Sequence, residues 1–161
     1  MSSPDQAAPL AFLLTLRAYG TWLPGAAPGW NDRTQRGSHE PRPALERYAR
    51  SIMRWPPVIL DGAQRDTLRR ALHELCAERE WTLLAEAYAT EHLHVVVRAD
   101  VAATRLRTAA KARLTTVLKR AGLFPRERQL WSDYGSVRSL HTEHAVAAAC
   151  AYVDRHIPPR S

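Results

Sequence analysis

The sequence has few cysteines and no long hydrophobic run. Cys76 and Cys150 are its only cysteines, too few for a disulfide framework, and each falls in a helical pattern in which buried thiols are common. The longest apolar runs, such as residues 10–16, are far below the roughly 18 residues that a membrane-spanning helix needs. No cationic segment precedes an apolar one at the N-terminus. We therefore expect a cytoplasmic protein with no membrane segment and no catalytic thiol.

Acidic residues are scarce relative to basic ones. Lys and Arg number 23 against 16 Asp and Glu, a formal net charge of +7, which indicates a polyanionic partner. The chain has 161 residues and is 45% hydrophobic, enough for one domain with a core and too little for two. The sequence therefore predicts a single domain over residues 1–161.

Hydrophobic periodicity predicts an α+β protein. Asp61, Asp100 and Thr142 are suited to cap the starts of three helices, and Gly122 to end the second. The expected elements are a strand at 11–19, a helix at 61–80, strands at 81–90 and 91–99, a helix at 101–121, a strand at 136–141 and a helix from 142 to 158. This order matches the ferredoxin-like split βαβ sandwich, an antiparallel sheet with two helices on one face, followed by an added C-terminal helix.

Residues 24–57 form a long insertion rich in proline and glycine. Loops of this length are usually functional or disordered, and we expect a structured loop with a helical turn near residues 44–53. Trp22, Trp30 and Trp55 lie at or near its ends. The insertion either docks onto a partner or is a surface excursion pinned by aromatic contacts.

Two histidines, His92 and His94, begin the most β-branched stretch of the chain. Strand alternation places both imidazoles on one face, away from Leu93, where they either share a metal ion or cap a sheet edge. The third alternating position is Val96, which argues against a histidine-triad hydrolase. A two-histidine phosphoesterase needs two His-x-Thr/Ser repeats, and this sequence has one His-x-His.

A hydrolytic zinc site at the two histidines would need a carboxylate base, and Glu86 and Glu91 are poor candidates because strand parity turns Glu91 away.

The last helix offers further chemistry. Tyr152 and His156 are four residues apart, hence neighbours on the helix surface, with small alanines around them. They suit a nucleophile beside a metal ligand, or else a tyrosine at the core edge and a histidine at the helix end. Both lie on the flank of the expected core face, formed by Val146, Cys150, Val153 and Ile157.

Four segments together carry a family resemblance. They are residues 18–25 (AYGTWLPG), 91–97 (EHLHVVV), 135–140 (GSVRSL) after Trp131, and 151–156 (AYVDRH). The ensemble covers nearly the whole chain and resembles the HUH single-tyrosine transposases, specifically the insertion-sequence and REP-associated tyrosine transposase group. Members of this family usually carry Asn or Gln four residues after the tyrosine, where this chain has His156.

The resemblance implies a metal-dependent single-stranded DNA endonuclease and strand transferase that acts at DNA hairpins. It implies that Tyr152 is the nucleophile and forms a 5′-phosphotyrosine intermediate. It also implies that His92, His94 and His156 bind a divalent ion, Mg²⁺, Mn²⁺ or another transition metal. Insertion-sequence members work as dimers and REP-associated members can act as monomers, so a homodimer is one of two expectations.

Basic residues concentrate between residues 98 and 128. This segment holds nine Lys or Arg and two acidic residues, a net charge of +7. Phosphate contacts would give it sequence-independent affinity for DNA, and a nearby tryptophan could stack on unpaired bases; a solvated basic helix is the simpler alternative. The expected DNA contacts are Arg98, Arg105, Arg107, Lys111, Arg113, Lys119, Arg120 and Trp22.

Two other functions stay open. A non-catalytic, domesticated DNA-binding protein of the same fold would keep the basic helix and form no covalent adduct with DNA. A rolling-circle initiator or relaxase would share the metal chemistry, but such proteins commonly carry helicase or accessory regions, for which 161 residues leave no room.

Overall fold

A four-stranded antiparallel sheet in the order β4-β5-β1-β6 forms the centre of the computed structural model. The model describes residues 7–26, 30–31 and 38–156, of which Trp30, Asn31, Ser38 and Tyr134 are described by their backbone alone. Strand β5 pairs antiparallel with both β1 and β4, so it separates two parallel strands, as in a split βαβ unit. The strands are β1 (Ala11–Ala18), β4 (Thr82–Tyr88), β5 (His92–Arg98) and β6 (Trp131–Leu140).

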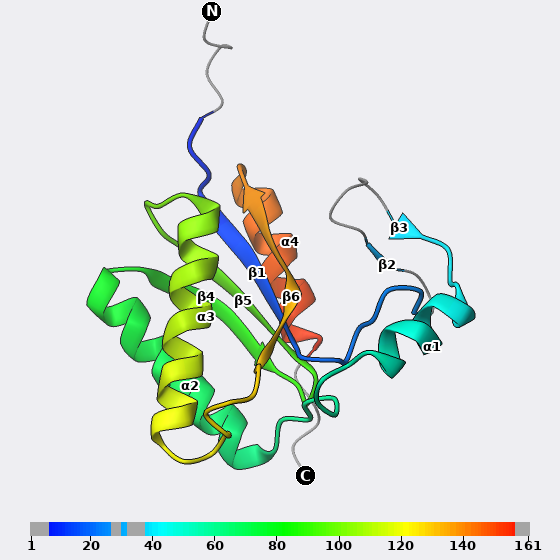
Figure 1. Cartoon of the computed structure of the whole chain (residues 1–161). Helices are drawn as coiled ribbons and strands as arrows, with labels where there is room; N and C mark the ends of the chain where they lie inside the picture. Colours follow the sequence, from blue (N-terminus) through cyan, green and yellow to red (C-terminus); the bar gives the residue numbers. More distant parts are fainter. Residues whose placement is uncertain (1–6, 27–29, 32–37, 157–161) are drawn as a thin grey trace, which may run out of the picture.

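Helices lie on both faces of the sheet. Helices α2 (Gly62–Arg79) and α3 (Ala103–Arg120) pack on one face, and α4 (Glu143–Asp154) crosses the other (Figure 1). The predicted α+β, ferredoxin-like sandwich with an added C-terminal helix is therefore confirmed. Among the described residues, no helix combines the length and the apolar character needed to cross a lipid bilayer.

Alternation of side chains along the strands builds two cores. Leu16 of β1 and Leu93 of β5 belong to the core between the sheet and the helices α2 and α3. Leu13 and Val96 have the opposite parity and are buried together with Val153 of α4. The face that α4 covers is consequently the face to which His92 and His94 belong.

Side-chain caps fix the starts of two helices. The carboxylate of Asp61 accepts a hydrogen bond from the backbone N–H of Gln64 at 2.7 Å, and the Gln64 side chain accepts one from the backbone N–H of Asp61 at 2.9 Å. This capping box starts α2 where the sequence predicts. The hydroxyl of Thr142 accepts from the backbone N–H of Ala145 at 3.0 Å and starts α4, as expected.

Two predicted helix bounds are wrong. Helix α3 has Ala102 as its N-cap, and no side chain caps it; Asp100 lies in the bend that leads out of β5 and is too early to serve. Helix α4 ends at Asp154, with Arg155 as its C-cap, instead of continuing to Pro158, which lies outside the described residues.

Strand β6 is longer than the sequence suggests. It begins at Trp131 and not at residue 136. Trp131 is buried and pairs with Ala18 beyond a register shift between Leu16 and Ala18. Polar residues and Gly135 interrupt the apolar pattern in this part of the strand, so periodicity alone does not reveal it.

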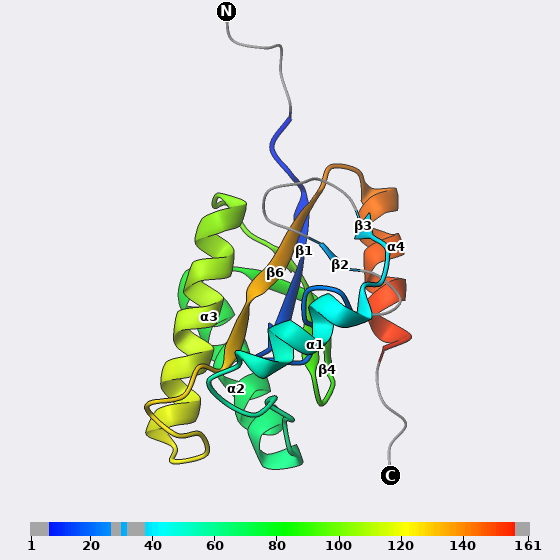
Figure 2. The ribbon, with the colours of Figure 1, turned by 45° about the vertical axis from the view of Figure 1, so that its right-hand side comes forward.

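The insertion at residues 24–57 contains the expected helix and also a short hairpin. Helix α1 (Pro43–Ser51) follows β2 (Trp30–Asn31) and β3 (Ser38–His39), which pair antiparallel. Within the described part of the chain α1 packs against no other helix or strand; it lies to one side of the sheet in Figure 1 and in front of the sheet in Figure 2. The base of α1 packs on Gly25, where φ is +87° and an added Cβ would lie 2.4 Å from the carbonyl oxygen of Arg42.

Candidate active site

His92 and His94 lie on the α4 face of the sheet, as strand alternation predicts. Their ring centroids are 4.7 Å apart. His94 is 5% exposed, and its Nδ1 shares a 2.7 Å hydrogen bond with the hydroxyl of Thr15, its partner on β1. His92 is half-buried and lies opposite Arg17, which is on β1 like Thr15. The central strands of the sheet therefore fix the position of both rings.

Helix α4 brings Tyr152 and His156 to the same place. Val153 is fully buried under the helix, which leaves Tyr152 on its flank with 39% of its surface exposed. The Tyr152 ring centroid lies 5.4 Å from that of His94 and 4.2 Å from that of His156. His156 is in turn 5.1 Å from His94, centroid to centroid. The structure thus joins the four residues Tyr152, His92, His94 and His156 in one cluster.

Hydrogen bonds determine which nitrogen of His156 is available. Its Nδ1 lies 2.7 Å from the backbone carbonyl oxygen of Tyr152. A carbonyl only accepts, so Nδ1 carries the proton, and in the neutral ring Nε2 holds a free lone pair. A metal-binding histidine commonly donates its other N–H to a carbonyl in this way.

The imidazoles on β5 favour the neutral form. Burial lowers the pKa of His94 to about 4, with further lowering by His92, His156 and Arg17. Burial also lowers the pKa of His92, helped by Arg17 and His156. Neutral imidazole is the form that binds a metal ion, so the environment suits these two rings to be ligands near neutral pH.

The spacing of the three rings tests whether they fit one metal ion. With a metal–nitrogen distance of about 2.1 Å, two imidazoles on one ion have centroids about 4.5 to 5.5 Å apart. The pairs His92–His94 and His94–His156 meet this condition, whereas His92 and His156 are 6.5 Å apart. As placed, no three His, Cys, Asp or Glu side chains of the described residues are arranged to hold a metal ion. The donors suit a divalent transition metal, provided that His92 and His156 approach each other by about 1 Å.

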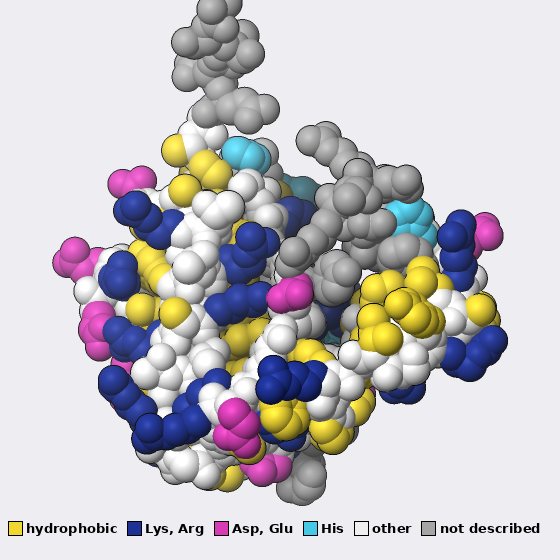
Figure 3. Space-filling view, in the orientation of Figure 1, with side chains coloured by type: hydrophobic (Ala, Val, Ile, Leu, Met, Phe, Trp, Pro, Cys, Tyr) yellow, Lys and Arg dark blue, Asp and Glu magenta, His cyan; other side chains and the backbone are white. Residues whose placement is uncertain are grey.

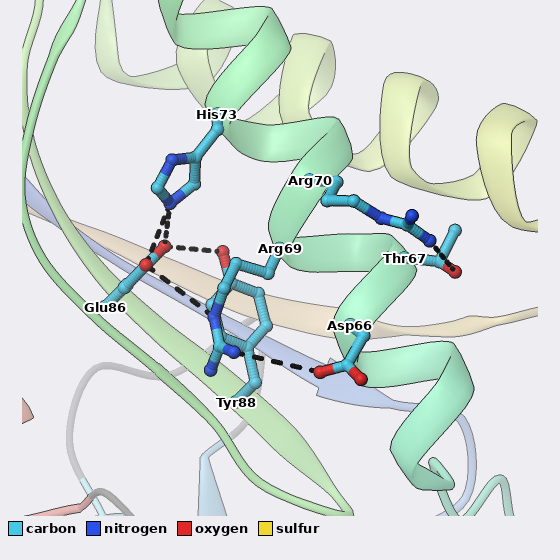
Figure 4. Close-up of polar contacts among 7 residues, drawn as sticks. All are labelled: Asp66, Thr67, Arg69, Arg70, His73, Glu86 and Tyr88. Atoms are coloured by element: carbon cyan, nitrogen blue, oxygen red, sulfur yellow. Dashed lines mark hydrogen bonds and ion pairs between the residues drawn. The ribbon is translucent and has the colours of Figure 1, made fainter.

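A second polar cluster surrounds Glu86 on the opposite face of the sheet (Figure 4). Both Glu86 carboxylate oxygens lie 2.8 Å from Nε2 of His73, and one accepts a 3.1 Å hydrogen bond from the hydroxyl of Tyr88. Arg69 adds an ion pair at 3.7 Å. Burial and the adjacent carboxylate raise the pKa of Tyr88 well above its usual range. Glu86 therefore links β4 to α2, consistent with its poor suitability as a base for the histidine pair.

The basic helix α3 lies on the face of the sheet away from Tyr152. Figure 3 shows Lys and Arg side chains spread over α3 and toward β6. Three of the expected DNA contacts donate to backbone carbonyl groups: Arg107 to Gly135, Lys111 to Ser132 and Lys119 to Arg126. The first two of these carbonyls belong to β6, an edge strand of the sheet. Arg107 and Lys111 therefore have a structural role, because they tie α3 to this edge strand.

The other expected basic contacts differ in their partners. Arg98 pairs with Glu143 at 2.9 Å, which ties β5 to the start of α4. Arg113 makes hydrogen bonds with both carboxylate oxygens of Glu78 on α2. Arg105 and Arg120 are exposed and make no ion pair within the described part of the chain. Among the basic residues of α3, these two therefore have the fewest hydrogen bonds and ion pairs to the rest of the described chain.

The tryptophans in and near the insertion are only partly available for stacking. The Trp22 ring has the guanidinium carbon of Arg17 at 4.9 Å from its centroid. Trp55 lies between Arg54 and Arg128, at 5.2 and 5.9 Å. The side chain of Trp30 lies outside the described residues.

Thr15 and Arg17 are the site residues that sequence reasoning missed. Both alternate with buried Leu14 and Leu16 along β1, so their shared face is visible in the sequence. What the sequence does not show is the register that sets Thr15 beside His94 and Arg17 beside His92. Register depends on pairing between strands far apart in the chain.

Two solved structures resemble this one. A REP-associated tyrosine transposase bound to a REP hairpin aligns with 95% of this chain and 70% of its own, at 14% identity and a TM-score of 0.53. A candidate transposase from Deinococcus radiodurans R1 aligns over 98% of both chains, at 15% identity and a TM-score of 0.51. A scan of protein-family models and a search of curated proteins find no match. The chain therefore has the fold found in tyrosine transposases.

Proposed function

We infer that this protein is a metal-dependent single-stranded DNA endonuclease and strand transferase that acts at DNA hairpins. The observation that carries the proposal is the position of Tyr152, whose ring lies 4.2 Å from that of His156 and 5.4 Å from that of His94. An exposed phenol beside imidazoles from a strand and from the turn that ends α4 is the arrangement expected of a nucleophile next to a metal-bound phosphate. The shared fold with tyrosine transposases supports it.

The reaction is an exchange of phosphodiester bonds. The Oη of Tyr152 attacks the phosphorus, a P–O bond to tyrosine forms, and the bond to the 3′-oxygen breaks. The phenol loses its proton, and the departing oxygen takes one up to become a 3′-hydroxyl. The 5′-phosphotyrosine retains the bond energy, so a second 3′-hydroxyl can reverse the step and join another DNA end without ATP.

A phenol with a pKa near 10 is a weak nucleophile at neutral pH, so the phosphate must be polarised. A divalent ion held by His92, His94 and His156 would supply Lewis-acid polarisation of that phosphate. The protein's part is to orient these rings: Thr15 holds His94, and the Tyr152 carbonyl oxygen holds His156. The exposed flank of α4 leaves Tyr152 accessible to a strand that is not base-paired.

A DNA partner is supported by charge and by the structural comparison. The net charge is +7, and one structure of the same fold is bound to a REP hairpin. A basic face along α3 (Figure 3) supplies cations away from Tyr152. Long-range attraction of the phosphate backbone by these cations would add affinity that does not depend on sequence.

A covalent-adduct assay tests the proposal. Labelled single-stranded hairpins are incubated with the protein and Mn²⁺ or Mg²⁺, and the products are separated on a denaturing gel. We expect a protein-linked band that EDTA suppresses. DNA binding without any adduct would favour the non-catalytic DNA-binding alternative. One structural argument supports that alternative: the ring centroids of His92 and His156 are 6.5 Å apart, too far for two ligands of one metal ion.

A further inference from the structure

Arg17 places a positive charge beside the histidine cluster. It lies opposite His92 on the neighbouring strand, and residues paired in this way have Cα atoms about 4.5 to 5.5 Å apart. It shares the strand face of Thr15, which holds His94. Arg17 therefore lies on the same face of the sheet as both rings, and directly beside His92.

Trp22 holds the guanidinium group of Arg17 in place. The guanidinium carbon lies 4.9 Å from the centre of the Trp22 ring, within the range of a cation–π contact. The turn that carries Trp22 is itself fixed, because the hydroxyl of Thr21 donates to the carbonyl oxygens of Ala18 at 2.7 Å and Glu91 at 3.3 Å. The ends of β1 and β5 that border the site thus both support this one contact.

Arg17 has no carboxylate partner within the described residues. Arg98 and Arg113, by contrast, each pair with a glutamate. Without a carboxylate partner, the guanidinium group of Arg17 keeps its positive charge available to an anion in the site. A phosphate suits this position, because a guanidinium group binds two of its oxygens at once.

We propose that Arg17, held by Trp22, binds the phosphate that Tyr152 attacks and neutralises charge on its non-bridging oxygens during the transfer. This rests on the proposed strand-transferase function and adds a residue to it. Arg17 forms and breaks no covalent bond. It acts by a preorganised contact, which is most effective where the surrounding dielectric is low.

The test compares Arg17→Ala and Arg17→Lys with Arg138→Ala, measuring adduct formation in a single turnover at saturating hairpin DNA with Mn²⁺. Arg138 is a matched control, because it is an exposed arginine that pairs with Leu13 and so lies on the same face of the sheet. We expect Arg17→Ala to slow the step about 100-fold or more, as for the loss of one oxyanion donor. Arg17→Lys should recover part of the rate, and Arg138→Ala should retain it.

A second substrate separates a phosphate contact from a loss of structure. A methylphosphonate at the scissile position has one neutral group in place of an anionic oxygen. The Arg17→Ala defect should shrink to about tenfold or less on this substrate, since there is less charge for Arg17 to neutralise. An equal defect on both substrates would overturn the proposal.

The failure of the inference is distinguishable from failure of the proposed function. If wild type forms the adduct and Arg17→Ala forms it as fast as Arg138→Ala, Arg17 has no such role while strand transfer stands. If wild type forms no adduct with any hairpin, both proposals fall. Far-ultraviolet circular dichroism of each variant confirms folding, and Arg17→Gln repeats the test if Arg17→Ala does not fold.

Discussion

The backbone carbonyl of Tyr152 accepts a 2.7 Å hydrogen bond from Nδ1 of His156. The residue proposed as nucleophile therefore sets the tautomer of the ring one helical turn later and leaves Nε2 of that ring as the acceptor nitrogen. A single helical turn thus couples the position of the phenol to the orientation of a proposed metal ligand. Any shift of this turn would move both groups together.

The identity of the ligand at position 156 should set the metal preference. Three imidazoles are softer than two imidazoles and an amide, so we expect Mn²⁺ or Co²⁺ to support adduct formation better than Mg²⁺. His156→Gln should shift the preference toward Mg²⁺. The measurement is the ratio of adduct rates in the two metals, with the exposed His144 on the same helix as the control, changed to Gln. An unchanged ratio in His156→Gln would mean that His156 is not a ligand.

Thr15 should act through His94. Thr15→Val preserves shape but removes the hydrogen bond to the buried ring, so the apparent affinity for Mn²⁺ should fall about 10- to 100-fold. Thr15→Ser keeps a hydroxyl and should stay close to wild type. A Mn²⁺ titration of the adduct rate compares the two variants. Equal affinity in Thr15→Val and Thr15→Ser would show that the hydrogen bond does not orient a ligand.

Much of this organisation could be predicted from the sequence, because local signals agree with the fold. Alternation placed both histidines on one face, and the four-residue spacing placed Tyr152 beside His156; the structure bears out both. The start of β6 and the cap of α3 could not be predicted, because they depend on a register shift at Ala18 and on the length of the bend after β5. Local propensity contains neither piece of information.

DNA affinity should depend on salt through the exposed cations of α3. If about four to six phosphates are bound by basic side chains, log K should fall with log[salt] at a slope of roughly −3 to −4 on a largely single-stranded hairpin. Replacing Arg105 and Arg120 with Ala should make the slope shallower by about 0.7 for each phosphate that the variant no longer neutralises. Arg113→Ala should change it less, because Glu78 already pairs with that guanidinium group.

Fluorescence anisotropy across a salt series measures these slopes. A blunt duplex of the same length serves as the comparison substrate and should bind more weakly than the hairpin with a single-stranded flank. If replacing Arg105 and Arg120 with Ala leaves the slope unchanged, the exposed face of α3 does not belong to the DNA-binding surface. Equal affinity for the blunt duplex would count against a single-stranded substrate.

Covalent capture of DNA by wild type and by Tyr152→Phe tests the central proposal most directly. The substitution removes one exposed oxygen and keeps the ring, so DNA affinity should stay close to wild type while the protein-linked band disappears; Tyr48→Phe, at an exposed tyrosine of α1, should keep the band. Peptide mass spectrometry of the wild-type adduct should place the nucleotide on Tyr152. A band that persists in Tyr152→Phe would contradict the assignment and make Tyr134 the next residue to test.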